Sequence, residues 1–319
     1  MREYISAIAP LIKSYALFQQ ASDRLSLNWE LSLKLFDRHC KANYPEKAYL
    51  TQEMVDTWCC QRDTEINNSC ISRINPITGL VRYLRERGKT DVSEPVSPRK
   101  ERRTYIPHAF SGIELQNFFR ACDEISDKSK KFSEQLRRIT VPAFFRLLYS
   151  SGIRTCEARM LRREDVDLAN GVLNIRLTKG VAQHYVVLHD SMLLLMKQYD
   201  SAVSKMFPDR VYFFPHHKGS HYERYWVQDN FQRMWRKYNT AHATAYELRH
   251  NYAVENINRW TNEGFNFDTK LTYLSKSMGH SEVESTKYYY SLTPLMADIL
   301  AVHSNDDDVL PEVRYAEII

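Results

Sequence analysis

The segment GHSEVESTKYYYSLTP, residues 279–294, places a Gly-His pair shortly before three consecutive tyrosines. A tyrosine hydroxyl that is activated by its surroundings can act as a nucleophile. If the segment is helical, successive side chains point about 100° apart, so the three tyrosines cannot all present a hydroxyl to the same atom. The spacing from other motifs must therefore decide which tyrosine is the candidate nucleophile.

Other side chains suited to an anionic substrate are spread along the second half of the chain. Arg154, in SSGIRTCEARML, stands at an expected helix start, where a guanidinium and the helix N-terminus can both face an anion. Lys179 lies at the expected turn of LTKGVAQHYVVL, and AYELRHNYAVENI places Tyr246 one helical turn before Arg249. Each of these residues alone, like His280 alone, is typical of an ordinary solvated surface or helix end.

The order of these motifs resembles the tyrosine recombinase (phage integrase) family. That family carries an Arg in a TGLR-x-x-E box, a Lys on a β-hairpin, an H-x-L-R-H box, a GH box and a Tyr nine residues later. The corresponding stretches are SGIRTCE, LTKGVAQHYVVL, YELRH and MGH, and the match extends over residues 108–295. Counting nine residues from His280 gives Tyr289, with Thr286 three before it. The resemblance therefore implies Tyr289 as the nucleophile, with Tyr288 packed toward the core and Tyr290 partly exposed.

The resemblance also implies a role for each group at a DNA phosphodiester. Arg154 and Arg249 would clamp the non-bridging oxygens with their planar forks, and His280 would donate a further hydrogen bond. Lys179 would protonate the departing 5′ oxygen, leaving a 3′-phosphotyrosyl link at Tyr289. This set of groups requires no metal ion or nucleotide as a cofactor.

One position departs from the family pattern. Tyr246 stands where the H-x-L-R-H box has its first His, and a neutral phenol is a poor base that still donates a hydrogen bond. We expect activity to be retained. His242, one turn earlier, is an alternative imidazole, although a surface position is the stronger expectation for it. Glu157, one turn after Arg154, is expected to orient an arginine or stabilise the helix rather than to accept a proton.

The elements that position these groups are predicted from periodicity and capping residues. Residues 3–90 are predicted to be helical, with Thr51 as one cap, Pro76 where a helix can bend and Gly88 at a helix end. SGIELQNFFRACDEI predicts a capped amphipathic helix, and VPAFFRLLYSSGIRTCEARML predicts two helices separated at Ser151 and Gly152. GVLNIRLTKGVAQHYVVLHD predicts two alternating strands, after which helices resume.

The expected fold is mainly α with a small antiparallel β-sheet in the catalytic domain, arranged as a two-domain DNA clamp. We expect residues 1–92 to form a helical core-binding (SAM-like) domain, 93–107 a basic linker, and 108–319 the catalytic domain with a C-terminal tail. The linker carries a basic cluster that consists of Arg99, Lys100, Arg102 and Arg103. This cluster is expected to lie along a phosphate backbone, and simple solvated chain is the alternative.

Composition limits the class of protein. A chain of 319 residues with 43% hydrophobic residues can build two modest cores, and a net charge of +5 weakly favours a polyanionic partner. The six cysteines include no C-x-x-C pair, so reduced thiols are expected rather than a zinc site. No stretch approaches the roughly 18 apolar residues of a membrane span. A cytoplasmic bacterial protein, associated with the nucleoid when bound, is therefore expected.

Three function classes remain open at this level. The first is a site-specific recombinase or integrase of a mobile element, the second a type IB topoisomerase-like enzyme, and the third a DNA-binding protein with a decayed active site. The five motifs argue against the third. The segment INRWTNEGFNFDTKLTYLSKSMGHSEVESTKYYYSLTPLMADIL resembles integrases carried by bacterial transposons and favours the first.

The expected partners are double-stranded DNA with specific sites and further copies of the chain in a tetramer held by the C-terminal tail. Accessory recombinases are an open alternative. For the tail itself, a frayed terminus is the alternative.

Overall fold

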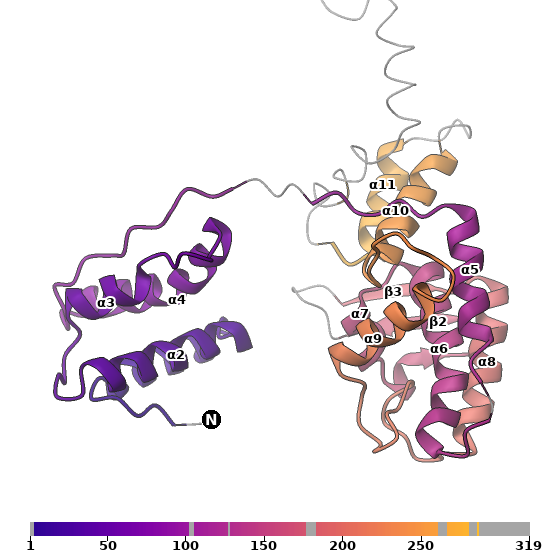
Figure 1. Ribbon diagram of the computed structural model, residues 1–319, viewed down its shortest axis with the longest axis horizontal. Helices are drawn as coiled ribbons and strands as arrows, with labels where there is room; N and C mark the ends of the chain where they lie inside the picture. Colours follow the sequence, from indigo (N-terminus) through magenta and orange to yellow (C-terminus); the bar gives the residue numbers. More distant parts are fainter. Residues whose placement is uncertain are drawn as a thin grey trace, which may run out of the picture. The chain divides into compact units, whose positions relative to one another are not determined.

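The first four helices of the chain share a core of their own. The computed structural model describes residues 3–101, 105–126, 128–176, 183–260, 267–280 and 286. Its first helices are α1 (Ala9–Ala21), α2 (Leu27–Asn43), α3 (Gln52–Cys59) and α4 (Asn67–Arg85) (Figure 1). The side chains buried between them include Ile12, Phe36, Val55, Ile77 and Leu80. The helical character predicted for residues 3–90 is thereby confirmed.

Local capping explains where these helices begin and end. The Ser26 side chain accepts a hydrogen bond from the backbone of Trp29 at the start of α2 (3.2 Å), and Thr51 accepts one from Met54 at the start of α3 (3.4 Å). The cap predicted at Thr51 is therefore confirmed. Pro76 lies inside α4, and Gly88 takes a left-handed backbone (φ +61°) three residues after that helix ends.

The chain that follows α4 stays on the surface of this first unit. The amide of Ser93 donates to the side chain of Gln52 (2.8 Å), and the Asn67 side chain donates to the carbonyl of Arg99 (3.0 Å). Asn68 both donates to and accepts from the backbone of Glu101 (2.9 and 3.2 Å). Residues 93–101, which the sequence assigns to a linker, are thus fixed to α3 and α4 by hydrogen bonds.

The chain divides into two units, Met1–Tyr105 and Ile106–Ile319. The side chains of Arg99 and Lys100 are exposed at the end of the first unit. Arg102 and Arg103, the other two members of the predicted basic cluster, lie outside the described residues.

The second unit is mostly helical around a small sheet (Figure 1). Its helices are α5 (Gly112–Asp123), α6 (Phe132–Ser151), α7 (Thr155–Met160), the 3-10 helix η1 (Arg163–Asp165), α8 (Asp190–Ser204), α9 (Arg224–Trp235), α10 (Glu247–Trp260) and α11 (Phe267–Ser277). Helix α6 packs against α5, α8 and α10. The aromatic centre of the core is formed by Phe118, Phe144, Phe145, Phe231 and Trp235.

The strands of the second unit form an antiparallel sheet in the order β1, β2, β3. Strands β2 (Val172–Ile175) and β3 (His184–Val187) pair with Val172 opposite Val187 and Ile175 opposite His184, which confirms the predicted pair of strands. Strand β1 (Val166–Asp167) adds a short edge that the alternating pattern did not predict. The predicted turn at Lys179 and Gly180 lies outside the described residues.

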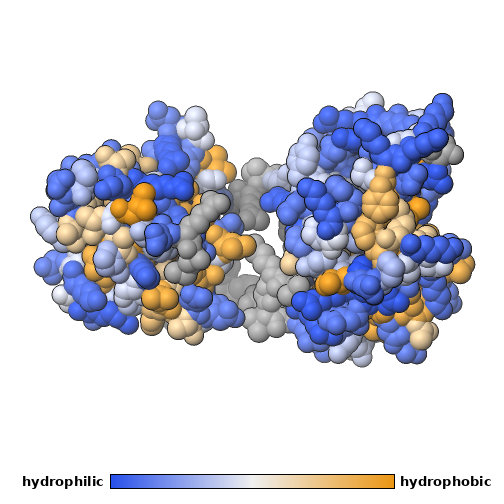
Figure 2. Space-filling view, turned by 90° about the horizontal axis from the view of Figure 1, so that it is seen from below, coloured by the Kyte–Doolittle hydropathy of each residue, from blue (hydrophilic) through white to orange (hydrophobic). Residues whose placement is uncertain are grey.

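The predicted helix boundaries around the site are also confirmed. Ser111 caps α5 in a capping box with Glu114, and α6 ends where Gly152 takes a left-handed backbone (φ +64°) before α7 begins. The face of the molecule seen in Figure 2 is mostly hydrophilic, with hydrophobic residues in separate patches. Within the described ranges, none of the helices has the length and hydrophobicity needed to cross a membrane.

Candidate active site

Arg154 is held at the start of α7 by an acid and a backbone carbonyl. It is the N-cap residue of this helix, and its own amide donates to Glu157 Oε2 (2.7 Å). One guanidinium nitrogen of Arg154 pairs with Glu157 Oε1 (2.7 Å), and the other donates to the carbonyl of Gly279 (2.9 Å). Glu157 has no exposed side-chain surface. Its carboxylate therefore orients the arginine, as the sequence predicts.

Arg249 lies in the first turn of α10 and is only 2% exposed. Its guanidinium donates to the carbonyl of Gly152 (2.6 Å) and to that of Met278 (2.7 Å). These carbonyls follow the C-terminal ends of α6 and α11, where the helix dipole is negative. A buried cation requires such partners, because burying an unpaired charge costs a free energy on the order of several kcal/mol.

His280 completes a motif that ends α11. The amide of His280 donates to the carbonyl of Ser275 (3.0 Å), and the amide of Gly279 donates to that of Lys276 (2.9 Å). This is the Schellman pattern, in which the residue at the position of Gly279 must adopt a left-handed backbone (φ +63°). The Gly-His pair of the sequence is therefore a helix end that presents an imidazole at a defined place.

The hydrogen bonds of His280 determine which ring nitrogen carries its proton. Nε2 lies 2.9 Å from a guanidinium nitrogen of Arg249, and Nδ1 lies 2.7 Å from the hydroxyl of Thr286. A guanidinium can only donate, so Nε2 accepts, and the neutral ring must carry its proton on Nδ1 and donate it to Thr286. Thr286 is fully buried.

The same surroundings disfavour a positive charge on His280. Burial, followed by the charges of Arg249 and Arg154 and then by His184, lowers the pKa of His280 to about 4. The imidazole is therefore neutral at pH 7 in the free protein. The pKa of His250, which follows Arg249 in α10, is also lowered, chiefly by burial.

The structure brings together three of the residues predicted for catalysis. Arg154 and Arg249 bind consecutive carbonyls, those of Gly279 and Met278, and Arg249 also contacts His280. Two further predicted residues, Lys179 and Tyr289, lie outside the described residues, as do Tyr288 and Tyr290.

Tyr246 stands immediately before α10 at the edge of this cluster. Its side chain is 46% exposed, and its ring meets that of His250 edge-on, with the ring centroids 5.1 Å apart. A phenol in this place is accessible to a substrate. His242, the alternative imidazole, is exposed in the segment before α10.

Sequence reasoning missed one residue beside the cluster. His184, the first residue of β3, is 7% exposed and lines a pocket of about 590 Å³ together with Gly279 and His280. Side chains alternate between the two faces of β3, and positions 184 and 186 are buried, so this alternation could have indicated that the side chain of His184 points inward. Only its neighbours in the fold identify it as part of the site.

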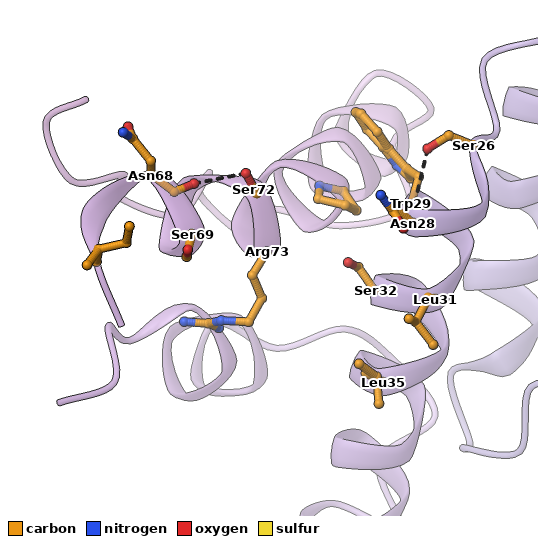
Figure 3. A pocket seen from close by; sticks show the side chains of 12 residues that line it. Ser26, Asn28, Trp29, Leu31, Ser32, Leu35, Asn68, Ser69, Ser72 and Arg73 are labelled. Atoms are coloured by element: carbon orange, nitrogen blue, oxygen red, sulfur yellow. Dashed lines mark hydrogen bonds between the residues drawn. The ribbon is translucent and has the colours of Figure 1, made fainter. Parts of the chain in front are cut away.

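The first unit contains a separate groove between α2 and α4 (Figure 3). Hydroxyl and amide side chains line it from both helices, with Ser32 and Asn28 on α2 and Ser69 and Ser72 on α4. Arg73 and the apolar residues Leu31, Leu35, Ile66 and Pro76 line it as well, so the lining mixes apolar side chains with uncharged hydroxyl and amide groups. Groups of this kind donate and accept hydrogen bonds without carrying a net charge.

Comparison with known proteins decides the family. Residues 114–295, more than half of the chain, match the phage integrase family. The chain belongs to this family. The resemblance that five motifs indicated is thereby confirmed.

The integrase has relatives among curated proteins. It is 30% identical over 190 residues to one putative integrase/recombinase of Sinorhizobium fredii and 27% identical over 266 residues to another. These alignments cover 57% and 78% of this chain, and 59% and 82% of the relatives. The chain thus spans under two thirds of the first relative's length. It is also 23% identical to the tyrosine recombinase XerC of Oceanobacillus iheyensis, over 72% of both chains.

Solved structures share the fold of the integrase at low sequence identity. One is the XerH site-specific recombinase bound to a palindromic difH substrate, with a TM-score of 0.61, 15% identity, and coverage of 88% of this chain and 79% of that one. Another is the Tn1549 transposon integrase in complex with transposon right end DNA, with a TM-score of 0.59, 14% identity and coverage of 92% and 99%. The expected fold class, mainly helical with a small antiparallel sheet, is confirmed.

Proposed function

We propose that this integrase cuts and rejoins DNA at specific sites through a 3′-phosphotyrosyl link to Tyr289. The observation that carries the proposal is the cluster of Arg154, Arg249 and His280 around the turn at Met278 and Gly279. Two guanidinium groups fixed by consecutive carbonyls place two positive charges beside one turn, where they would attract one phosphate. Preorganised cations of this kind stabilise the charge that develops on the non-bridging oxygens.

The proposed reaction exchanges one phosphodiester for another. The hydroxyl oxygen of Tyr289 bonds to phosphorus, the bond from phosphorus to the 5′ oxygen breaks, and one proton in total passes from the phenol to that oxygen. Lys179 supplies the proton to the leaving oxygen, and Arg154 and Arg249 hold the phosphate. A 5′ hydroxyl from another strand reverses the step and joins that strand. Tyr246 adds a hydrogen bond at the exposed edge of the site.

The proposed partner is double-stranded DNA, contacted by both units as a clamp. The basic stretch that includes Arg99 and Lys100 would lie along the phosphate backbone, and the hydroxyl and amide side chains of the groove between α2 and α4 would face a DNA groove. The solved complexes of XerH and of Tn1549 integrase with DNA support this assignment. In the cell, the protein would accompany the nucleoid.

We further propose that four copies act together on a site carried by a mobile element. A solved structure of similar fold is a lambda integrase tetramer bound to a Holliday junction (TM-score 0.58, 14% identity). The apolar residues near the end of the chain, among them Val309, Leu310 and Val313, would form the contact between copies. Accessory recombinases are a further component that the reaction can require.

A suicide substrate tests the proposed chemistry. If a nick lets the short 5′ fragment diffuse away, religation fails and the wild-type protein should accumulate as a covalent adduct, also in excess chelator. Tyr289→Phe should bind the same DNA with similar affinity, since phosphate contacts dominate binding, but should form no adduct. Gel shift and denaturing gels measure the two quantities on the same samples.

Two neighbouring variants provide matched controls for this experiment. Tyr288→Phe and Tyr290→Phe should still form the adduct, because each loses only a hydroxyl that the proposed mechanism does not use. Peptide mapping that places the DNA on either neighbour, or an adduct that survives in Tyr289→Phe, would contradict the assignment. Relaxation of supercoiled DNA without a specific site would favour a topoisomerase-like activity instead.

A further inference from the structure

His184 packs directly on the backbone of the Gly-His turn. A Cβ atom built on Gly279 would lie 2.5 Å from Cε1 and 2.7 Å from Nδ1 of the His184 ring, closer than real side chains approach. A glycine is therefore required at position 279 for two reasons. Its backbone has a positive φ, and the imidazole of His184 occupies the space that a side chain would need. The ring and the turn are in van der Waals contact.

The turn under this ring holds every described member of the cluster. The carbonyl of Gly279 binds Arg154 (2.9 Å), and that of Met278 binds Arg249 (2.7 Å). His280 is the next residue along the chain. A small rotation of the Met278–Gly279 backbone would move both carbonyls and the imidazole together, since consecutive peptide planes share their dihedral angles.

The ring of His184 does more than fill a hydrophobic core. It stands at the wall of the pocket of about 590 Å³ that opens beside His280. The next residue along β3, Tyr185, is 62% exposed, so this strand forms a border of the site. The strand also begins two residues after the segment 177–182, which contains Lys179.

We infer that His184 is a positioning residue for strand cleavage, whose ring fixes the Met278–Gly279 turn and through it the directions of Arg154, Arg249 and His280. This inference rests on the proposed phosphodiester chemistry of that cluster. Loss of the ring removes one of the contacts that fix the turn, and the guanidinium groups then meet the phosphate in a poorer geometry. Misplacement by about 1 Å is enough to slow a reaction on the order of 100-fold.

The test compares cleavage rates on two suicide substrates at saturating DNA. One substrate has the ordinary 5′ oxygen at the scissile bond, and the other has a bridging sulfur, which leaves as a thiolate without a proton. His184→Ala should cleave about 10- to 100-fold more slowly than wild type on both substrates, with its DNA affinity unchanged. Lys179→Ala should be slow only on the oxygen substrate, because sulfur removes the need for a general acid.

Two variants keep the test decisive if His184→Ala folds poorly. His184→Phe retains a ring against Gly279 and should recover most of the rate, whereas His189→Ala, an exposed position at the N-cap of α8, should cleave at the wild-type rate. In a double-mutant cycle, Gly279→Ala should be severely slowed, and Gly279→Ala with His184→Ala should regain part of that loss because the clash disappears.

The outcomes separate this inference from the function on which it rests. If the wild-type protein forms no adduct with either substrate, the proposed function fails and the inference with it. If the wild type cleaves but His184→Ala cleaves equally well, the inference alone is overturned. It is also overturned if sulfur restores the rate of His184→Ala, or if the losses caused by the two single substitutions simply add.

Discussion

The proton on His280 belongs to Nδ1 in the free protein, and this limits what the ring can do when DNA arrives. Nε2 accepts from Arg249, so in this state it has no hydrogen to donate to a phosphate oxygen. A phosphate between the two arginines would offset their charge and favour a proton on Nε2. The proposed hydrogen bond to the phosphate would therefore require the imidazole to change from acceptor to donor when the anion binds.

Binding of DNA should therefore be coupled to uptake of a proton by His280. The free-state pKa of His280 is about 4, and the bound phosphate should raise that pKa, so affinity should increase as the pH falls from the bound-state pKa toward 4. Above the bound-state pKa this contribution vanishes. Calorimetric titrations near pH 5.5, in buffers with different ionisation enthalpies, measure the protons taken up.

The comparison with two histidine variants identifies the responsible group. His280→Gln should take up fewer protons than wild type, whereas His242→Gln, which changes an exposed imidazole outside the cluster, should behave as wild type. Equal proton uptake by wild type and His280→Gln would disprove the coupling.

At the scale of elements, two helix ends organise the site. Helix α6 ends at Gly152 and α11 ends in the turn at Gly279, and both turns direct carbonyls at arginines. A helix that ends in a left-handed glycine exposes its last carbonyls, which would otherwise need water or another donor. The same local event that ends each helix thus creates a binding site for a guanidinium.

Gly152→Ala should destabilise the second unit and also impair cleavage. The backbone of Gly152 has φ +64°, and a Cβ there would collide with the ring of Tyr252. We expect the free energy of unfolding to fall by about 2 kcal/mol or more, since strain and overpacking both contribute. Cleavage should fall as well, because the carbonyl that binds Arg249 would move. Urea unfolding and the adduct assay measure the two effects.

Gly219→Ala is the matched control in the same unit. Gly219 also has a positive φ (+81°), but no atom lies within 4 Å of a Cβ built there. This variant should lose about 1 kcal/mol from backbone strain alone and should cleave normally. If the free energy of unfolding fell equally in both variants, the collision with the ring of Tyr252 would contribute nothing to the loss of stability.

For the whole molecule, the important feature is the basic segment at the end of the first unit. Asn67 and Asn68 hold the backbone at Arg99 and Glu101, which leaves the side chains of Arg99 and Lys100 exposed. Fixing the backbone reduces the conformational entropy that the segment loses when it binds a polyanion.

Arg99→Ala combined with Lys100→Ala should weaken DNA binding and reduce its salt dependence. Each phosphate contact that is lost should lower the slope of log affinity against log salt by about 1. At saturating DNA the cleavage rate should be unchanged, because these side chains lie in the other unit from Arg154 and Arg249. Binding isotherms at several salt concentrations give the slope.

Lys197→Ala serves as the control for charge alone. Lys197 is exposed on α8, a helix that contributes none of the site residues. Its removal should change neither the slope nor the affinity. A double variant of Arg99 and Lys100 that keeps the wild-type salt slope would show that this segment does not contact phosphates.

The sequence by itself determined the features that depend on a few neighbouring residues. SGIELQNFFRACDEI predicted the capped helix α5, Thr51 predicted the start of α3, and Ser151 with Gly152 predicted the break between α6 and α7. Caps and left-handed glycines act through hydrogen bonds that span three to five residues, so they can be read from short stretches. The order of the motifs then indicated the family and the identity of the arginines and His280.

Tertiary structure alone decided how those residues are held. Arg249 meets the carbonyl of Gly152 across 97 residues, and Arg154 meets that of Gly279 across 125. Such contacts depend on how α6, α10 and α11 pack, and no local pattern encodes which backbone carbonyl a guanidinium will reach. The same holds for the ring of His184 on Gly279 and for the proton on Nδ1 of His280, because both depend on neighbours that are distant in sequence and that only the fold brings together.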